Sequence, residues 1–159
     1  MKRKIAKWDR NFAIGNDDVL LLDKFIVENN IKNVLEIGPG RSTEVFLRLG
    51  CNVTAIEHKQ FMINLINSRL IHERLTVIKW SDNIQFAHKF DFGFVDGPSH
   101  PLSRNSACEL VSKYCNKFML HDSIRPDEMA IIDKYIGSGW SVTNLDSKRG
   151  LALLEICRS

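Results

Sequence analysis

Five carboxylates stand at or close to the end of a short apolar run: Glu36, Glu57, Asp82, Asp96 and Asp122. A carboxylate accepts hydrogen bonds from ligand hydroxyl groups, and beside a reacting hydroxyl it removes the proton that the oxygen must lose. If the apolar runs are parallel strands of an open sheet, their carboxyl ends meet at the edge where such sheets bind ligands. The pattern therefore indicates a polar site assembled from several strand ends.

The most informative stretch is residues 33–43, NVLEIGPGRST, in which a β-branched apolar run breaks at a G-P-G turn and a helical pattern follows. Glycine lets the backbone approach a ligand because no Cβ intervenes, and the N–H groups that open a helix bind polar or anionic groups. Nicotinamide and flavin sites prefer a third glycine, where this chain has Thr43. The other ligand-binding pattern has an acidic residue two positions before G-x-G, and Glu36, Gly38 and Gly40 fit it. A tight turn that binds no ligand remains the structural alternative.

Glu57 ends the next apolar run, 19 positions after Gly38. A carboxylate near this offset, at the end of a second strand, can accept both hydrogen bonds from the hydroxyls of a ribose. S-adenosylmethionine and NAD both contain that ribose. Glu57 therefore supports a nucleoside cofactor without choosing between the two.

Apolar periodicity and turn residues divide the chain into alternating strands and helices. Strands are predicted from Asn33 and over 51–58, 75–80, 90–96 and 117–123, and two more follow residue 139 on either side of the turn 146–148. Helices are predicted over 19–28, 42–50, 60–71, 102–114 and 127–136. This alternation predicts an α/β fold with a doubly wound, mostly parallel seven-stranded sheet that ends in an antiparallel hairpin, its antiparallel strand near 151–156.

The ordered set EIGPG, Glu57, WSD, FVDGP, LHDS and the terminal hairpin resembles the class I S-adenosylmethionine-dependent methyltransferases, in particular the small O-methyltransferases. The resemblance covers residues 19–157 and implies a Rossmann-like methyltransferase fold. It also implies an enzyme that transfers a methyl group to a small or exposed acceptor, with oxygen as the favoured atom. In this family Glu36, Gly38 and Gly40 would surround the methionine part of the cofactor.

The resemblance also assigns roles to the later strand ends. Trp80, Ser81 and Asp82 would lie beside the adenine, and Asp96 would face the methyl-bearing end of the cofactor. A sulfonium methyl is already activated, so the enzyme mainly holds the acceptor in line and supplies a base when the acceptor is a hydroxyl. The candidate catalytic residues are Asp96, His100 and Asp122.

The histidine that precedes Asp122 is a separate question. Adjacent strand residues point to opposite faces, so His121 and Asp122 are not expected to serve one site unless the strand has already ended. His121 is expected to be a satisfied core histidine rather than a catalytic base. Some catechol-type methyltransferases bind Mg²⁺ through carboxylates after these two strands and a neighbouring amide, and Mg²⁺ prefers such oxygen ligands. Asp96 and Asp122 match two of those positions, whereas Ser123 stands where the family has its amide. The resemblance thus leaves a Mg²⁺ site open.

The composition is that of an ordinary globular protein, with 159 residues, 44% of them hydrophobic and 26% charged, and a single domain is expected over 1–159. Basic side chains gather in residues 1–16, which are expected to form a flexible segment or lid, but a net charge of +3 does not indicate a nucleic-acid partner. No apolar run reaches the ~18 residues of a membrane-spanning helix, and the basic start lacks the apolar segment of a secretory signal. The four cysteines show no C-x-x-C spacing, which suits reduced thiols and a cytoplasmic protein.

Two other functions remain open from the residues alone. One is a non-catalytic module of the same fold that binds S-adenosylmethionine or a protein partner, and the other is an NAD-dependent oxidoreductase. The terminal hairpin favours the methyltransferase, because a Rossmann dehydrogenase domain does not require it. Contacts with an acceptor must come from the N-terminal segment and from residues 97–104 and 123–126, which suits a small molecule, a protein partner or an oligomer that completes the pocket.

Overall fold

The computed structural model describes residues 14–99 and 102–157 of the chain. In this part, the strands are β1 (Asn33–Ile37), β2 (Asn52–Glu57), β3 (Leu75–Lys79), β4 (Phe92–Val95), β5 (Lys117–His121), β6 (Trp140–Leu145) and β7 (Leu151–Ile156). The helices are α1 (Asn16–Glu28), α2 (Arg41–Arg48), α3 (Gln60–Arg69), α4 (Asn105–Tyr114) and α5 (Pro126–Gly137). Strands and helices alternate along most of the chain, as predicted.

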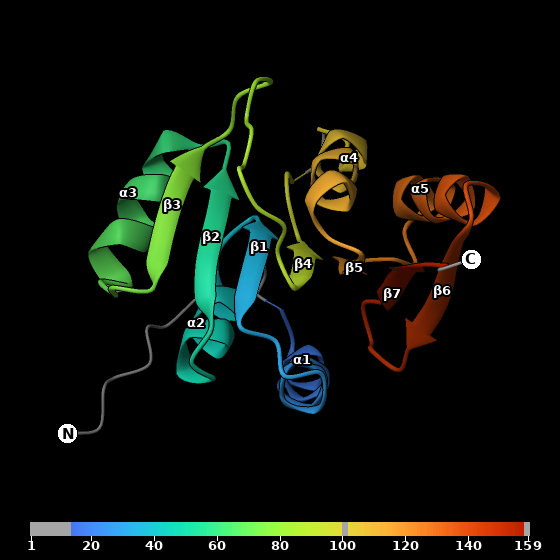
Figure 1. Cartoon of the computed structure of the whole chain (residues 1–159), viewed down its shortest axis with the longest axis horizontal. Helices are drawn as coiled ribbons and strands as arrows, with labels where there is room; N and C mark the ends of the chain where they lie inside the picture. Colours follow the sequence, from blue (N-terminus) through green and yellow to red (C-terminus); the bar gives the residue numbers. More distant parts are fainter. Residues whose placement is uncertain (1–13, 100–101, 158–159) are drawn as a thin grey trace.

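The seven strands form one sheet in the order β3-β2-β1-β4-β5-β7-β6 (Figure 1). Strands β1 to β5 are parallel, whereas β7 runs antiparallel between β5 and β6. The prediction of a mostly parallel seven-stranded sheet with a terminal antiparallel hairpin is confirmed. The chain winds outward from β1 to β3 and then crosses back to β4, so the strand order reverses between β1 and β4. Open α/β sheets bind their ligands at such a reversal.

Helices cover both faces of the sheet (Figure 1). Helices α1 and α2 pack on one face, where the core includes Leu22, Val34 and Phe46. Helices α4 and α5 pack on the other face, where the core includes Leu35 and Val111. Because Val34 and Leu35 are neighbours on β1, the two cores show the period-two alternation of a strand that is buried on both faces.

The connection between β3 and β4 contains no helix. Residues 80–91 cross the sheet as a loop, and Ile84 and Phe86 pack against the core beneath α4. The Phe86 ring meets Phe90 and Tyr114 edge-on, with centroids 5.1 and 5.0 Å apart. Edge-to-face contacts of this kind stabilise an aromatic cluster. The loop therefore covers the part of the face that a helix would otherwise cover.

Two helices begin elsewhere than the sequence predicts. Helix α1 begins at Asn16 rather than at residue 19, because the carboxylate of Asp18 accepts a hydrogen bond from the Gly15 amide at 2.9 Å and caps the first turn. Helix α4 begins at Asn105 rather than near residue 102, and its first amide donates to the Ser103 hydroxyl at 3.1 Å. In both cases a short polar side chain satisfies an amide that the helix itself leaves without a partner.

Two strands are shorter than predicted. Strand β4 covers Phe92–Val95 instead of 90–96, since Phe90 makes only an isolated bridge with Cys115. Strand β5 ends at His121 instead of residue 123, because Asp122 has a left-handed backbone with φ of 58° and cannot continue the strand. The second difference matters for the site, because it changes the direction in which Asp122 points.

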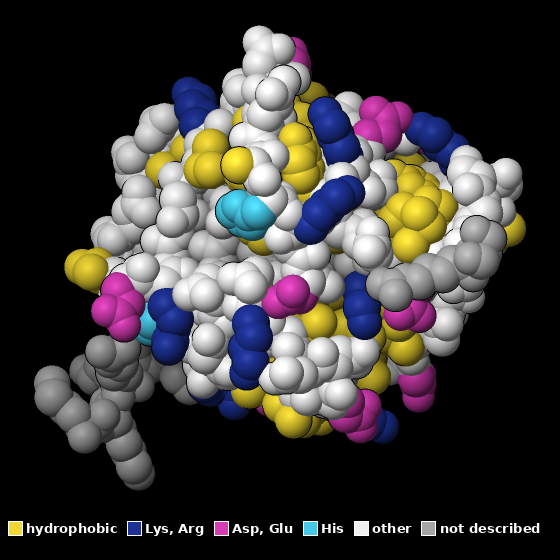
Figure 2. Space-filling view, viewed as in Figure 1, with side chains coloured by type: hydrophobic (Ala, Val, Ile, Leu, Met, Phe, Trp, Pro, Cys, Tyr) yellow, Lys and Arg dark blue, Asp and Glu magenta, His cyan; other side chains and the backbone are white. Residues whose placement is uncertain are grey.

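No helix in the described ranges is long and apolar enough to span a bilayer. The thiols of Cys51, Cys108, Cys115 and Cys157 are all free, and burial raises the pKa of Cys108 and Cys115 to about 12. These two buried thiols therefore stay protonated and unreactive at neutral pH. On the face shown in Figure 2, the Lys and Arg side chains are interleaved with hydrophobic and uncharged atoms rather than gathered in one tract.

Candidate functional site

The carboxyl ends of β1 to β5 lie side by side at one edge of the sheet. Ile37 at the end of β1 pairs with Ile56 of β2 and with Val95 of β4. Val95 pairs in turn with Leu120 of β5. On the outer side, Glu57 of β2 pairs with Lys79 of β3. The predicted site residues that follow these strand ends are therefore brought to one edge: Gly38, Glu57, Trp80, Asp96 and Asp122.

The two glycines of the turn after β1 have different surroundings. Gly38 has φ of +85°, and a Cβ built on it would lie 2.8 Å from the amide nitrogen of Gly97 and 2.9 Å from the carbonyl carbon of Asp96. Gly38 thus permits close contact between the turns that follow β1 and β4. A Cβ on Gly40 would meet no atom of the described residues within 4 Å. The open space in front of the turn, where a ligand can approach the backbone, therefore lies at Gly40.

Glu36 is fully buried on the α2 side of β1, and its carboxyl oxygens contact the first turn of α2. Ser42 donates a hydrogen bond to one oxygen, and Thr43 donates to the other at 2.6 Å. The Thr43 hydroxyl also accepts a hydrogen bond from the Gly40 amide at 2.9 Å. Burial raises the pKa of Glu36 to about 8, although the two hydroxyl donors oppose the shift and the charge of Asp96 adds to it. Glu36 therefore connects β1 to the first turn of α2 and, through Thr43, to the glycine turn between them.

The carboxylate of Glu57 is oriented by the backbone that follows it. One oxygen, Oε1, accepts hydrogen bonds from the amides of His58 at 2.7 Å and Lys59 at 2.9 Å. The Glu57 side chain is half-buried at the end of β2. Its carboxylate is thus held in one orientation at the place where the sequence predicts a ribose contact. The amino group of Lys59 donates to the Ser99 hydroxyl at 3.2 Å and links the loops after β2 and β4.

The residues after β3 form an aromatic and polar corner. The ring of Trp80 stacks on His58, with centroids 4.6 Å apart and planes inclined by 14°. Burial lowers the pKa of His58, while the charge of Glu57 opposes the shift, so the stacked imidazole is neutral at neutral pH. Ser81 and Asp82 are exposed, and Asp82 accepts a long hydrogen bond of 3.4 Å from the Trp80 indole. The structure thus brings the predicted adenine-pocket residues next to the end of β2.

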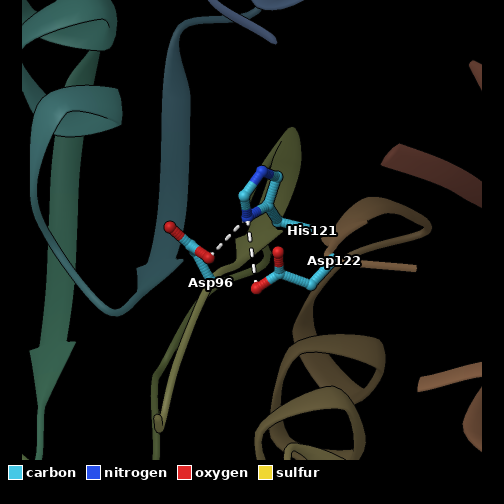
Figure 3. A group of neighbouring side chains, drawn as sticks. All are labelled: Asp96, His121 and Asp122. Carbon is cyan, nitrogen blue, oxygen red and sulfur yellow. Dashed lines mark hydrogen bonds and ion pairs between the residues drawn. The ribbon is translucent and has the colours of Figure 1, made fainter. Parts of the chain in front are cut away.

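Asp96, at the end of β4, is joined to the centre of the molecule through His121. Nδ1 of His121 lies 2.7 Å from Oδ1 of Asp96 and 3.7 Å from Oδ2 of Asp122 (Figure 3). Nε2 of the same ring lies 3.1 Å from Oδ2 of Asp18, on α1. The side chains of His121 and Asp18 are 0% and 1% exposed, whereas that of Asp96 is 14% exposed. This chain of contacts therefore runs from a buried helix start to the surface of the site.

The carboxylate of Asp122 is shared among three guanidinium groups. Arg104 donates to its Oδ2 at 3.0 Å, Arg125 approaches the same oxygen at 3.1 Å, and Arg149 donates to Oδ1 at 2.9 Å. Arg104 is itself buried, donates to the backbone carbonyl of His121 at 2.7 Å and lies 3.5 Å from Asp96. Both carboxylate oxygens of Asp122 are thus occupied by guanidinium contacts. Asp122 therefore serves as an anchor for the arginines.

The His121 ring is positively charged at neutral pH. Burial alone would lower its pKa, but the hydrogen bonds to Asp18 and Asp96 and the charges of Asp96 and Asp122 outweigh burial and raise the pKa to about 9. For Asp18, burial alone would raise the pKa of the carboxyl group. Hydrogen bonds from His121, Ser147 and Gly15 outweigh burial and lower that pKa below its usual value. His121 is thus a satisfied, buried histidine, as predicted, and not a free base.

The start of α1 is tied to the site from two other directions. The hydroxyl of Ser147, in the loop between β6 and β7, donates to Asp18, and the amide of Lys148 donates to Asp17 at 2.8 Å. The guanidinium of Arg41, at the start of α2, donates to the Ile14 carbonyl at 3.0 Å and to Asn16 at 2.6 Å. The hairpin loop and the turn after β1 therefore both hold the helix start in place.

Several members of this cluster were not predicted from the sequence. In the sequence, Asp18 merely precedes the helix predicted over 19–28, and its contact with His121 spans 103 positions. Arg149 lies in a hairpin loop whose residues indicate only a turn. Two predictions lie outside the described residues, namely His100 as a base and residues 1–13 of the proposed N-terminal lid. The rest of that segment, residues 14–16, packs at the start of α1.

The donor set at the ends of β4 and β5 does not fit a divalent metal ion. The nearest ligand atoms of Asp96, His121 and Asp122 lie within 4.8 Å of one another. However, both ring nitrogens of His121 face carboxylates, and Asp122 already receives Arg104, Arg125 and Arg149. Metal ligation needs neutral imidazole and free carboxylate lone pairs. A dication would also be placed beside His121 and the arginines, where like charges repel it.

The sequence matches no protein-family model and no curated protein. Several solved structures do match. The O-methyltransferase TomG from Streptomyces achromogenes, in complex with S-adenosylmethionine, is 16% identical with a TM-score of 0.73, over 94% of this chain and 83% of that one. An O-methyltransferase from Bacillus cereus, in complex with S-adenosylhomocysteine, is 15% identical with a TM-score of 0.65, over 91% and 83% of the two chains. The glycopeptide N-methyltransferase MtfA is 15% identical with a TM-score of 0.63, over 89% and 90%.

At these identities the likeness establishes the fold, which is that of the class I S-adenosylmethionine-dependent methyltransferases. The resemblance found in the sequence is thus confirmed at the level of the fold. O- and N-methyltransferases both share it. The fold therefore does not determine which atom accepts a methyl group, and function must be argued from the site.

Proposed function

We propose that this protein binds S-adenosylmethionine at the carboxyl edge of its sheet and transfers the methyl group to a small or exposed acceptor, with oxygen as the favoured atom. The observation that carries the proposal is the open space at Gly40. Gly40 follows β1, which lies between β2, ending at Glu57, and β4, which Asp96 directly follows. A cofactor seated on this turn reaches both carboxylates at once.

The residues of the edge suit the three parts of the cofactor. The turn at Gly38 and Gly40, held from beneath by Glu36, offers backbone groups to the methionine part. Glu57 has one carboxylate oxygen fixed by backbone amides, and we assign its other oxygen to the ribose hydroxyls. Trp80, Ser81 and Asp82 provide a ring face and polar groups for the adenine.

Asp96 is the residue that we assign to the reaction. When bound, S-adenosylmethionine supplies a methyl group on a positively charged sulfur that is ready for nucleophilic attack. Asp96 orients the acceptor and takes up the proton when the acceptor is a hydroxyl. Its Oδ1 is fixed by His121, so the carboxylate is held in one position. His100 remains a proposed second base, and Asp122 acts as an anchor for the arginines rather than as a base.

Calorimetric titration of the protein with S-adenosylmethionine, S-adenosylhomocysteine and NAD tests the proposal. We expect the two sulfur compounds to bind and NAD not to bind. Gly40→Leu should abolish binding, because its side chain would fill the open space, whereas Gly137→Leu at the end of α5 should leave binding unchanged. Gly137 is the matched control because a Cβ there also meets no described atom within 4 Å. Binding of NAD alone would favour an oxidoreductase instead.

A screen of hydroxyl, amine and protein acceptors then separates an enzyme from a binding module. Transfer of labelled methyl to any acceptor supports the enzyme. Cofactor binding without transfer across the screen favours the non-catalytic module. We also propose a cytoplasmic location, which the four free thiols support. Fractionation of cells that express the tagged protein tests it.

A further inference from the structure

His121 lies where the ends of β4 and β5 approach each other. Some catechol-type methyltransferases of the family that the sequence resembles bind their divalent ion after the corresponding two strands. We propose that the His121 imidazolium, held by Asp18 of α1, is the permanent cation of this site in place of a metal, and that Asp18 is a positioning residue for Asp96. The inference deepens the proposed function and rests on it for the role of Asp96 in methyl transfer.

The first support is the geometry of the ring. Both nitrogens of His121 face carboxylate oxygens, Nδ1 at 2.7 Å from Asp96 and Nε2 at 3.1 Å from Asp18. A neutral imidazole has one N–H and one lone pair, so one of the two contacts would set a lone pair against a carboxylate. Two protons on the ring satisfy both contacts. The ring is therefore a cation between two anions.

The second support is the balance of charge around the ring. The carboxylates of the cluster are Asp18 from α1, Asp96 after β4, Asp122 after β5 and Glu128 from α5. The cations are His121, Arg104 before α4, Arg125 before α5 and Arg149 from the β6–β7 loop. Among the residues that the structure describes, four negative groups of this cluster thus face four positive groups. An added dication would upset this balance, whereas the imidazolium completes it.

The third support is the burial of Asp18. Its carboxylate is 1% exposed and receives hydrogen bonds from His121, Ser147 and the Gly15 amide. A cap for α1 needs only the bond to Gly15. The additional contact with His121 is made at Oδ2, the oxygen that also accepts the Gly15 amide, while Ser147 donates to Oδ1. It fixes the ring, and the ring in turn fixes Oδ1 of Asp96. Asp18 therefore acts on the site through His121 without reaching the surface itself.

Two consequences follow for the reaction. Cofactor binding and methyl transfer require no divalent ion, because the cation that neutralises Asp96 belongs to the chain. The acceptor then needs one nucleophilic atom beside the methyl group, and not the pair of adjacent oxygens that chelates a metal. Acceptors with a single hydroxyl or amine are thus the class that we expect.

The test combines two measurements on the wild-type chain. Nitrogen-15 NMR of the His121 ring should show both nitrogens protonated at neutral pH. Excess MgCl₂ or EDTA should leave the melting temperature and the affinity for S-adenosylmethionine unchanged. A neutral ring, or a melting temperature that rises with MgCl₂ and falls with EDTA, would overturn the proposal. Failure of the wild type to bind S-adenosylmethionine would instead refute the proposed function. The NMR measurement would then still decide whether the His121 ring is a cation.

Two matched variants test the role of Asp18. Asp18→Asn keeps the shape and removes the charge, so the ring should lose its second proton at a lower pH, by at least one pH unit. Asp17→Asn is the control, because Asp17 contacts the Lys148 amide and not His121. An unchanged ring titration in Asp18→Asn would refute the positioning role. If Asp18→Asn does not fold, Ser147→Ala removes one hydrogen-bond donor from the same carboxylate and leaves its charge to the contact with His121. The ring should then lose its second proton at a higher pH, whereas no shift or a shift to lower pH would count against the role of Asp18.

Discussion

Gly38 and Gly97 lie backbone against backbone, with 3.0 Å between the Cα of Gly38 and the position that a Cβ on Gly97 would take. The turn after β1 and the turn after β4 are thus in direct contact at the point where the strand order reverses. Neither position has room for a side chain. This contact sets how close the glycine turn lies to Asp96, and hence the shape of the proposed cofactor site.

Replacing Gly38 should therefore damage the fold, whereas replacing Gly40 should not. Gly38→Ala places a Cβ 2.8 Å from the Gly97 amide at φ of +85°, and we expect it to lose about 2 kcal/mol or more of unfolding free energy. Gly40→Ala is the matched control and should change stability little, because it faces open space. Urea unfolding curves of both variants give the comparison. Equal stability of the two variants would contradict the backbone contact.

Glu57 should contribute to cofactor binding without contributing much to catalysis. Glu57→Ala removes the acceptor for the ribose hydroxyls and should weaken S-adenosylmethionine binding by about 1–3 kcal/mol, the scale of a lost hydrogen-bond partner. The amides of His58 and Lys59 lose the same acceptor, so the loop after β2 should also become less ordered. Calorimetry measures the affinity. Glu28→Ala, which changes an exposed carboxylate of α1, provides the control and should bind normally.

The fold was predictable from the sequence because its signals are local. Alternating apolar runs and glycine turns mark the strands and helices, and the turn at 146–148 marks the terminal hairpin. Once the strands are assigned, the grouping of their last residues is predictable as well, since parallel strands bring their carboxyl ends to one edge of the sheet. Element boundaries were less predictable where one polar side chain decides them, as Asp18 does for α1 and the left-handed Asp122 does for β5.

The central cluster was only partly predictable, because its members meet through long-range contacts. Asp96 and Asp122 follow strands and were identified from that position. Asp18 looks like a helix cap in the sequence, and it is one, but only the folded sheet brings His121 to the carboxylate oxygen that accepts the Gly15 amide. The sequence also predicts that neighbouring strand residues diverge. His121 and Asp122 meet because the backbone turns left-handed between them.

The charge of His121 should make the protein less stable at high pH. Its pKa is raised from 6.5 to about 9 in the folded protein, so the folded state holds the proton more tightly than the unfolded chain. The resulting stabilisation is complete below pH 6.5 and is lost as the pH rises through about 9. The loss should be about 3 kcal/mol at most. Urea unfolding at a series of pH values measures it, and His121→Gln should remove the dependence above pH 8.

Glu36 should add to this dependence at lower pH. Its pKa is raised from 4.5 to about 8, so the folded state binds a proton that the unfolded chain has already released. Stability therefore falls as the pH rises from 4.5 to about 8, which is opposite to the effect of a salt-bridged carboxylate. Glu36→Gln resembles the protonated form and should flatten this part of the curve. A variant that retains the full slope between these pH values would show that another group causes it.

Asp96 separates catalysis from binding, if the protein transfers methyl groups as proposed. Asp96→Asn keeps an oxygen that accepts the His121 proton but removes the charge. An interaction that is made mainly in the transition state lowers turnover when it is lost, whereas one made equally in the ground state weakens binding. We expect Asp96→Asn to bind S-adenosylmethionine nearly normally and to turn over about a hundred times more slowly, the scale of a lost general base. Calorimetry and transfer of labelled methyl to the acceptor found by screening measure the two effects, with Asp133→Asn on the exposed side of α5 as the control. Turnover at the wild-type rate would remove Asp96 from the reaction, and a loss of binding equal to the loss of turnover would assign it to the cofactor alone.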